Sequence, residues 1–225
     1  MRDLITRLTK FGFELMINLR KFKWIFFDFD GVVKESVSVK TDAFVKLFGS
    51  IDPLLKKKIR DHHEANGGLS RYEKIPVYLS WLGLDDSQKS IDGYAEKFSR
   101  LVRAGVIRSN WVPGARELIV EASKDSYLFV VSATPQNELY EILEAICLTQ
   151  YFEKVFGSPT PKDAALKALV DSYKVDRSRS VMIGDSESDY LAAESNGIPF
   201  ILRCTDLNKN LQSRLDCDQI SNFLI

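Results

Sequence analysis

The chain has 225 residues, of which 45% are hydrophobic and 28% are charged, so it can bury a substantial core. Its 31 basic residues balance its 31 acidic residues, which argues against a protein that coats nucleic acid or an anionic membrane. The three cysteines, Cys147, Cys204 and Cys217, show no C-x-x-C spacing. We therefore expect no disulfide framework and no structural zinc site, and a reducing, cytoplasmic location fits best.

Residues 1–20 form an N-terminal extension with an apolar stretch at 11–19. The stretch is too short to cross a bilayer, which takes about 20 apolar residues. Glu14 and Asn18 interrupt it, and basic residues follow in place of a cleavage site, so a signal peptide is not expected. We expect an amphipathic helix that packs on the body of the protein, with contact to a membrane surface as the alternative.

The first predicted strand covers residues 24–27, where a continuous apolar run indicates burial on both faces of a parallel sheet. Residues 36–107 then show no convincing strand. Helical patterns are predicted there over 41–48, 53–62, 70–81 and 85–106. This block therefore predicts a helical subdomain inserted between the first strand and the rest of the sheet.

From residue 108 onwards, strands and helices alternate. Apolar runs predict strands over 127–131, 154–156, 180–183 and 198–202. Helical patterns are predicted over 113–122, 135–147, 161–173 and 190–195. This alternation predicts an α/β fold with a doubly wound parallel sheet, a Rossmann-like core.

Five polar side chains stand near the carboxyl ends of the predicted strands, where an open parallel sheet binds its ligands. They are Asp28, Asp30, Ser132, Lys162 and Asp185. Three carboxylates packed together repel one another, and a hard cation with oxygen ligands, such as Mg2+, relieves that repulsion. A lysine and a serine beside them suit a phosphoryl group. Each residue alone has a structural explanation as a cap or turn residue, but together they predict a magnesium and phosphate site.

Four segments resemble the signature motifs of the haloacid dehalogenase superfamily, in the family's order. They are Phe27-Asp28-Phe29-Asp30-Gly31-Val32, Val131-Ser132-Ala133-Thr134, Pro161-Lys162 and Gly184-Asp185-Ser186-Glu187-Ser188-Asp189. The resemblance runs from about residue 23 to the C-terminus and is closest to the branch that contains phosphoglycolate phosphatases and β-phosphoglucomutases. It implies a catalytic core of residues 21–35 and 108–225, and a mobile helical cap of residues 36–107.

The resemblance implies a catalytic role for the first two aspartates. Asp28 would be the nucleophile that forms an aspartyl-phosphate. Asp30 would protonate the leaving alcohol and later activate the hydrolytic water. The Asp28 carboxylate, the Asp30 backbone carbonyl and Asp185 would hold Mg2+. Asp189 would support the site from behind or contact the metal through water, and a structural role at a helix start is the equal alternative.

The resemblance also implies which residues hold the phosphoryl group and the rest of the substrate. Ser132, the backbone amide of Ala133 and Lys162 would bind the phosphoryl group. The cap loop would bind the substrate through Asn66, Gly67 and Arg71. Lys74, one turn later, is expected to be solvated, and His62 and His63 are expected to end a cap helix.

The second aspartate favours phosphoester hydrolysis, because a leaving alkoxide needs a proton and a leaving halide does not. We expect a magnesium-dependent phosphatase acting on a small phosphorylated metabolite, either a sugar phosphate or a phosphoglycolate-like acid. A sugar phosphomutase of the same family is an alternative, although residues 36–44 lack the histidine that such mutases usually carry. A non-catalytic, phosphate-responsive binding module is another. The substrate and the oligomeric state do not follow from the sequence.

Overall fold

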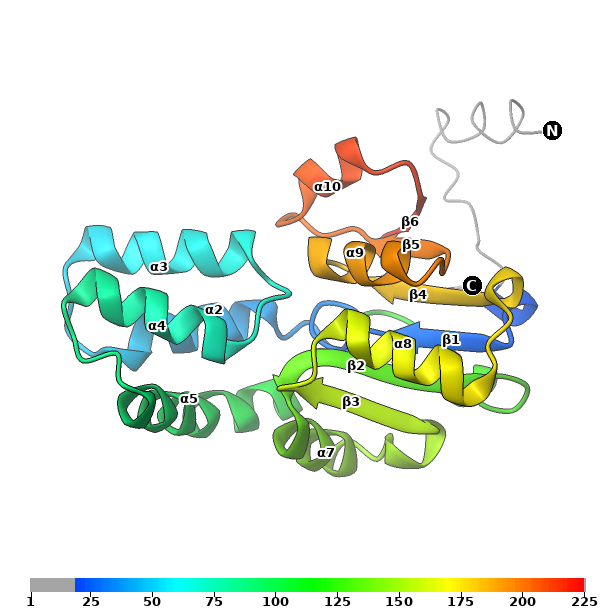
Figure 1. Ribbon diagram of the computed structural model, residues 1–225, viewed down its shortest axis with the longest axis horizontal. Coiled ribbons are helices and arrows are strands. Elements are labelled where there is room, and N and C mark those ends of the chain that lie inside the picture. The colour runs from blue at the N-terminus through cyan, green and yellow to red at the C-terminus, as the bar shows by residue number, and fades with distance from the viewer. Residues whose placement is uncertain (1–18, 225) are drawn as a thin grey trace.

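A computed structural model describes residues 19–224 as a six-stranded sheet with helices on both faces and a helical block at one end (Figure 1). The strands are β1 (Trp24–Phe27), β2 (Tyr127–Pro135), β3 (Lys154–Ser158), β4 (Ser180–Gly184), β5 (Phe200–Arg203) and β6 (Asp218–Ile220). Their order is β3-β2-β1-β4-β5-β6, and every neighbouring pair is parallel. The predicted doubly wound α/β fold is confirmed.

The central strands are apolar because both faces of the sheet are covered by helices. Ile25 and Phe27 of β1 belong to one hydrophobic cluster, together with residues of α6 (Ala115–Ala122) and α7 (Gln136–Ala145). Phe26 points to the opposite face, where its ring stacks on that of Phe129 with centroids 4.9 Å apart. Helices α8 (Lys162–Tyr173), α9 (Glu187–Ser195) and α10 (Lys209–Arg214) contribute to this second cluster. Short 3-10 turns cover Leu19–Lys21, Thr149–Tyr151 and Arg177–Arg179.

The helical block lies beyond the carboxyl ends of the strands, at the left of Figure 1. It consists of α2 (Val37–Leu47), α3 (Pro53–Ala65), α4 (Arg71–Leu82) and α5 (Gln88–Arg108). Phe44 is central to it, with ring centroids 4.0 Å from Phe98 and 5.4 Å from Tyr78. The two segments that join the block to the sheet meet in an antiparallel bridge between Lys34 and Trp111. The cap boundaries at residues 36 and 107 stay a prediction.

Some elements differ from the sequence-based prediction. Helix α9 begins three residues before the predicted start because Ser186 and Asp189 form a capping box there. Strand β6 and helix α10 were not predicted, since three and six residues are too short to show a clear periodicity.

The predicted N-terminal amphipathic helix lies outside the described residues, except for its last two positions. Within the described residues, no helix has the length and apolar character needed to cross a membrane.

Candidate active site

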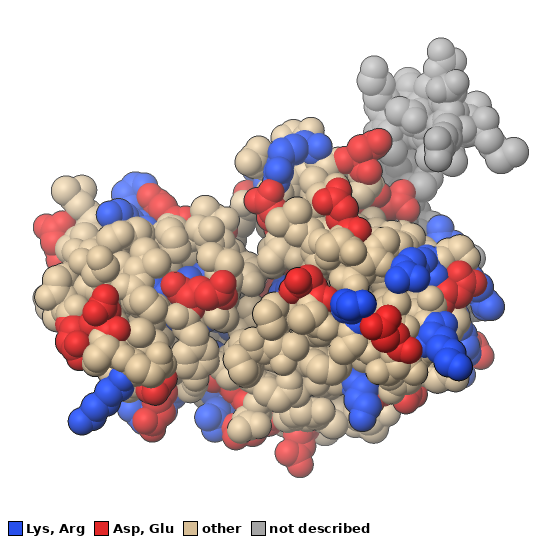
Figure 2. Space-filling model, viewed as in Figure 1, with Lys and Arg blue, Asp and Glu red and all other residues tan. Residues whose placement is uncertain are grey.

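The structure gathers the predicted strand-end residues around one cavity of about 430 Å³. Asp28 follows β1 and Asp185 follows β4, and the backbone N–H of Asp28 donates to Ile183 of β4 at 2.9 Å. Ser132 lies within β2, and Lys162 is the first residue of α8. The cavity lies between the core and the helical block, which meet at a notch in the space-filling view (Figure 2).

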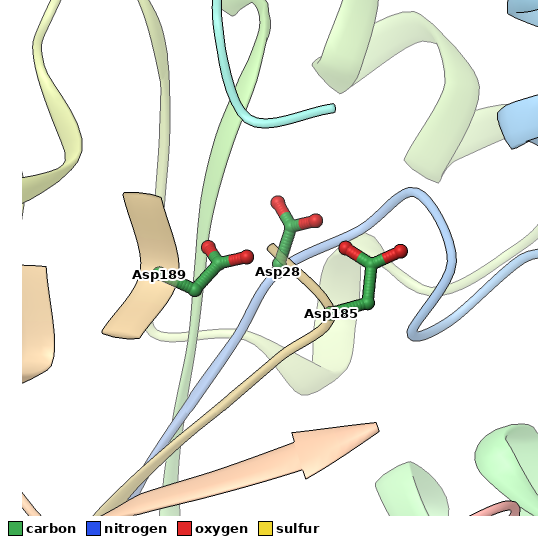
Figure 3. Close-up of side chains that lie close together, drawn as sticks. All are labelled: Asp28, Asp185 and Asp189. Atoms are coloured by element: carbon green, nitrogen blue, oxygen red, sulfur yellow. The ribbon is translucent and has the colours of Figure 1, made fainter. Parts of the chain in front are cut away.

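Three carboxylates form an acidic cluster, and two of them, Asp28 and Asp185, line the cavity. Oxygens of Asp28, Asp185 and Asp189 lie within 4.8 Å of one another, and the three side chains come from the ends of β1 and β4 and from α9 (Figure 3). Burial raises the pKa of Asp28 to about 7. The positive charge of Lys162 opposes this shift, and the negative charges of Asp189 and Asp30 add to it. Burial and the neighbouring Asp28 raise the pKa of Asp185 well above its usual value.

The cluster fits a divalent cation. Its donors are carboxylate oxygens, which Mg2+ prefers, and burial together with neighbouring carboxylates raises the pKa of Asp28 and that of Asp185. No described residue donates a hydrogen bond to the Asp185 carboxylate. Gly31 makes room for that carboxylate, since a Cβ at Gly31 would lie 2.1 Å from its Oδ2 and the backbone φ of +78° also favours glycine.

Lys162 lies between the acidic cluster and the residues predicted to bind phosphate. Its Nζ lies 2.9 Å from Asp28 Oδ1 and 2.5 Å from Asp189 Oδ1. Burial opposes its charge, but Asp189 and Asp28 outweigh this and raise the pKa of Lys162. The side chains of Ser132 and Ala133 line the same cavity, so the predicted phosphate-binding residues lie together.

Asp189 has two structural tasks. One carboxylate oxygen binds Lys162, and the other accepts hydrogen bonds from the Ser186 backbone N–H at 3.1 Å and the Ser186 hydroxyl at 2.5 Å. Asp189 therefore starts helix α9 and also fixes the position of Lys162. The two alternatives considered for this residue are compatible in the structure.

Asp30 lies on the cavity but its carboxylate does not belong to the acidic cluster. It accepts hydrogen bonds from Ser36 Oγ at 2.5 Å and Thr134 Oγ1 at 3.0 Å, and it forms an ion pair with Lys40. Burial would raise the pKa of Asp30, but Lys40 and the hydroxyls outweigh burial and lower it. Asp30 is therefore ionised in this arrangement.

Lys40 was missed by sequence reasoning. Val37, Lys40 and Phe44 of α2 all line the cavity, which is the i, i+3, i+7 spacing of one helix face. A lysine on an otherwise apolar helix face, close in sequence to the first motif, could have predicted that Lys40 lies in the cavity.

The cap loop reaches the core. Asn66 and Gly67 line the cavity, as predicted, and Asn66 Nδ2 donates to the His62 carbonyl at 2.8 Å. A Cβ at Gly68 would lie 1.8 Å from Ser188 Oγ, so only glycine allows this loop to approach the fourth motif so closely. The helical block is thus closed over the cavity.

Arg71, which was predicted to bind the substrate, has a guanidinium that protein groups largely engage. Although it lines the cavity, its two terminal nitrogens donate to the Glu138 carboxylate of α7 at 2.9 and 2.6 Å, and both side chains are buried. The guanidinium also contacts Ser99 and lies 4.7 Å from the Phe98 ring centroid. Arg71 thus ties the helical block to the core, and its contact with the substrate stays a prediction.

Lys74 corrects a prediction. It was expected to be solvated, but it is only 1% exposed and lines the cavity. His62 and His63 lie in the last turn of α3, as predicted.

Comparison with known proteins adds independent evidence. The profile of the family described as haloacid dehalogenase-like hydrolase matches residues 25–203. A phosphorylated carbohydrates phosphatase from Thermotoga maritima is 27% identical over 180 residues, which cover 77% of this chain and 81% of that protein. A phosphoglycolate phosphatase from Vibrio parahaemolyticus is 29% identical over 192 residues, covering 78% of this chain and 80% of that protein.

Solved structures share the fold. A mutant form of CbbY from Rhodobacter sphaeroides in complex with xylulose-(1,5)bisphosphate superposes with a TM-score of 0.73 at 17% identity. The match covers 90% of this chain and 95% of that one. A predicted phosphoglycolate phosphatase from Haemophilus somnus gives a TM-score of 0.70 at 18% identity, with the same coverage of both chains.

Proposed function

The chain belongs to the family of haloacid dehalogenase-like hydrolases, and on that premise we propose that it is a magnesium-dependent phosphatase. Its substrate is a small phosphate monoester, either a sugar phosphate or a phosphoglycolate-like acid, which is consistent with the names of the similar proteins. The observation that carries the proposal is the convergence of Asp28, Ser132, Lys162 and Asp185 on one cavity.

The first chemical step is attack by an Asp28 carboxylate oxygen on phosphorus, which forms an aspartyl-phosphate and breaks the bond to the leaving alcohol oxygen. Lys162, 2.9 Å from the nucleophile, offsets charge on both the nucleophile and the phosphoryl group. The Ser132 hydroxyl and the Ala133 backbone N–H hold the phosphoryl oxygens. Asp189 keeps Lys162 in place for this step.

Asp30 moves the protons. The ionised form in the structure is the one that takes a proton from water when the aspartyl-phosphate is hydrolysed. To protonate the leaving alcohol in the first step, Asp30 has to carry a proton itself. The negative phosphoryl group entering next to it favours this, because a nearby like charge raises the pKa of a carboxyl group.

The Asp28 and Asp185 carboxylates, with the Asp30 backbone carbonyl, would hold Mg2+. When bound there, the cation would neutralise the charge that gathers between nucleophile and phosphoryl group. Asp189 completes the acidic cluster, but Lys162 and Ser186 already occupy its oxygens, so it supports the site rather than binding the metal directly.

Removal of Mg2+ with a chelator is expected to abolish release of inorganic phosphate, and Asp185→Asn is expected to abolish the response to added Mg2+. The raised pKa of Asp185 means that burial makes its charged form unfavourable. Because asparagine carries no charge, this variant is also expected to unfold at a higher temperature than the metal-free wild type. Thermal unfolding with and without Mg2+, together with a phosphate-release assay, measures both effects.

The matched control is Asp171→Asn, an exposed aspartate paired with Lys167 on α8, which should keep the wild-type response to Mg2+. An Asp185→Asn protein that Mg2+ still stabilises as strongly as the wild type would contradict this metal site.

The alternatives give different products. A sugar phosphomutase would isomerise its substrate without net phosphate release, and a binding module would release nothing. Residues 36–44, where the mutases usually carry a histidine, instead carry Lys40, which forms an ion pair with Asp30, and this counts against the mutase. The complete set of reacting groups counts against a non-catalytic binding module. The net charge of zero and the interspersed surface charges (Figure 2) favour a small phosphorylated metabolite over nucleic acid. A cytoplasmic location is consistent with the three cysteines, which form no disulfide among the described residues.

A further inference from the structure

Lys74 is a basic residue in the cavity that the proposed chemistry does not use. It lies in α4, is 1% exposed and lines the same cavity as Asp28. Its Nζ has one hydrogen-bond partner among residues 19–224, the Nδ1 of His63 at 3.0 Å. Since an ammonium group has three N–H donors, two of them lack an acceptor in this part of the chain.

His63 cannot balance the charge. It is 3% exposed, and burial together with the charges of Lys74 and Lys40 lowers its pKa well below the usual value, so the ring is neutral. Its Nε2 is buried and has no hydrogen-bond partner among the described residues. When Nδ1 accepts a hydrogen bond from Lys74, the ring proton is on Nε2. The Nε2–H of His63 and two N–H groups of Lys74 are then donors without acceptors.

The carboxylates nearest to Lys74 are already engaged. Asp30 is paired with Lys40, and Glu73 accepts a hydrogen bond from the Ser70 backbone N–H at 2.8 Å at the start of α4. Burial, with added repulsion from Lys40, lowers the pKa of Lys74 to about 7 even though Asp30 and Glu73 oppose the shift. A buried cation without a counter-ion is unfavourable, and an anion placed against it relieves the cost.

We propose that Lys74 binds a second acidic group of the substrate, either a carboxylate or a second phosphoryl group, at the end remote from the phosphoester that Asp28 attacks. This inference rests on the proposed phosphatase function and narrows its substrate class. The cavity of about 430 Å³ has room for more than a phosphoryl group, and Phe44 and Phe98 line it alongside Lys74. These rings would contact the carbon skeleton between the two acidic groups. Lys74 is then a specificity-determining residue of the cap.

The test compares kcat/KM within pairs of substrates that differ only in the second acidic group. The pairs are phosphoglycolate with 2-hydroxyethyl phosphate, 6-phosphogluconate with sorbitol 6-phosphate, and glucose 1,6-bisphosphate with glucose 6-phosphate. The first two pairs test a carboxylate at two chain lengths, and the third tests a second phosphoryl group. An aryl phosphate without a second acid tests the phosphatase function by itself.

The wild type is expected to favour the more acidic member of at least one pair by about 30-fold or more, since losing one partner of a buried charge pair has an effect of that size. Lys74→Met is expected to remove most of this preference. The matched control is Lys57→Met, because Lys57 is an exposed cap lysine with a side chain 71% exposed, and it should keep the preference.

A wild type without preference in any pair overturns the inference, as does a preference that survives in Lys74→Met. An equal loss on both members of a pair also overturns it, because that result indicates a structural role. If the wild type does not hydrolyse the aryl phosphate with Mg2+ present, that result contradicts the proposed phosphatase function itself rather than the role of Lys74.

Thermal unfolding gives a readout that does not depend on activity. If Lys74 lacks a counter-ion in the empty cavity, Lys74→Met is expected to raise Tm at pH 7 by about 5 °C, because methionine fills a similar volume without a buried charge. The gain should shrink as the pH rises from 7 towards 10. Above pH 7 the folded chain has already lost the Lys74 proton, and between pH 7 and 10 the unfolded chain loses it as well. The free-energy cost of burying Lys74 therefore falls over this range, and with it the gain from Lys74→Met. A marked fall in Tm would show that the protein itself satisfies the charge, and would overturn the inference.

Discussion

Asp28→Asn is expected to lower kcat for phosphate release by about four to six orders of magnitude, because an amide cannot attack phosphorus as a carboxylate does. The substitution keeps the size and shape of the side chain. Lys162 also keeps its second carboxylate partner, Asp189. The measurement is release of inorganic phosphate from an aryl phosphate with saturating Mg2+.

The matched control for this variant is Asp163→Asn. Asp163 is the residue after Lys162 but is exposed on the first turn of α8, so its loss should leave kcat unchanged. Substantial phosphate release by a folded Asp28→Asn protein would rule out Asp28 as the nucleophile.

Asp30→Asn is expected to lower kcat by about two to four orders of magnitude, the usual contribution of general acid–base catalysis. The reduction should be larger for alkyl phosphates than for p-nitrophenyl phosphate, since a good leaving group departs without a proton. The proposed metal contact of Asp30 comes from its backbone, so Mg2+ should still raise Tm. Comparing kcat/KM across leaving groups of graded acidity measures the effect on the first step.

Asp30→Asn also takes the carboxylate partner from Lys40, whose side chain is only 12% exposed. Thermal unfolding therefore has to be measured in parallel, to separate lost catalysis from lost structure. An equal reduction of kcat/KM for good and poor leaving groups would show that Asp30 does not protonate the leaving alcohol, because kcat/KM does not include the later hydrolysis of the aspartyl-phosphate.

The strand-end residues could be predicted because a parallel sheet brings the carboxyl ends of its strands to one edge. Asp28, Ser132 and Asp185 are far apart in the chain, yet each follows or ends an apolar run that periodicity identifies. Lys162 could be predicted because a helix start stands next to the same edge. The acidic cluster and its lysine thus follow from strand order and residue type together.

The contacts between the cap and the core could not be predicted in the same way. The partner of Arg71 is Glu138, which lies 67 positions away on a different layer of the molecule. Lys74 is buried because α3 and α4 pack together, and this packing depends on tertiary geometry rather than on local periodicity. Sequence spacing shows which face a residue occupies, but it does not show what covers that face.

Arg71 and Lys74 show how the same cap helix can carry two different cations. Arg71 has a buried carboxylate partner on the core and therefore belongs to the closed structure itself. Among the described residues, Lys74 has a neutral histidine as its one hydrogen-bond partner and the Phe44 ring centroid 5.9 Å from its Nζ, and no carboxylate partner, so it is left for an acidic ligand. A buried cation whose N–H groups already have partners in the protein has a structural role, whereas one with unpaired N–H groups is suited to binding a ligand. Residue type alone does not distinguish these two roles.

The most direct test of the phosphatase mechanism is rapid acid quenching during turnover, followed by peptide mass spectrometry. We expect one phosphoryl group on the peptide that contains Asp28, present only while substrate and Mg2+ are available and absent from Asp28→Asn. Phosphate release by the wild type with no phosphorylated peptide at any quench time, or with the phosphoryl group on another residue, would contradict the aspartyl-phosphate mechanism.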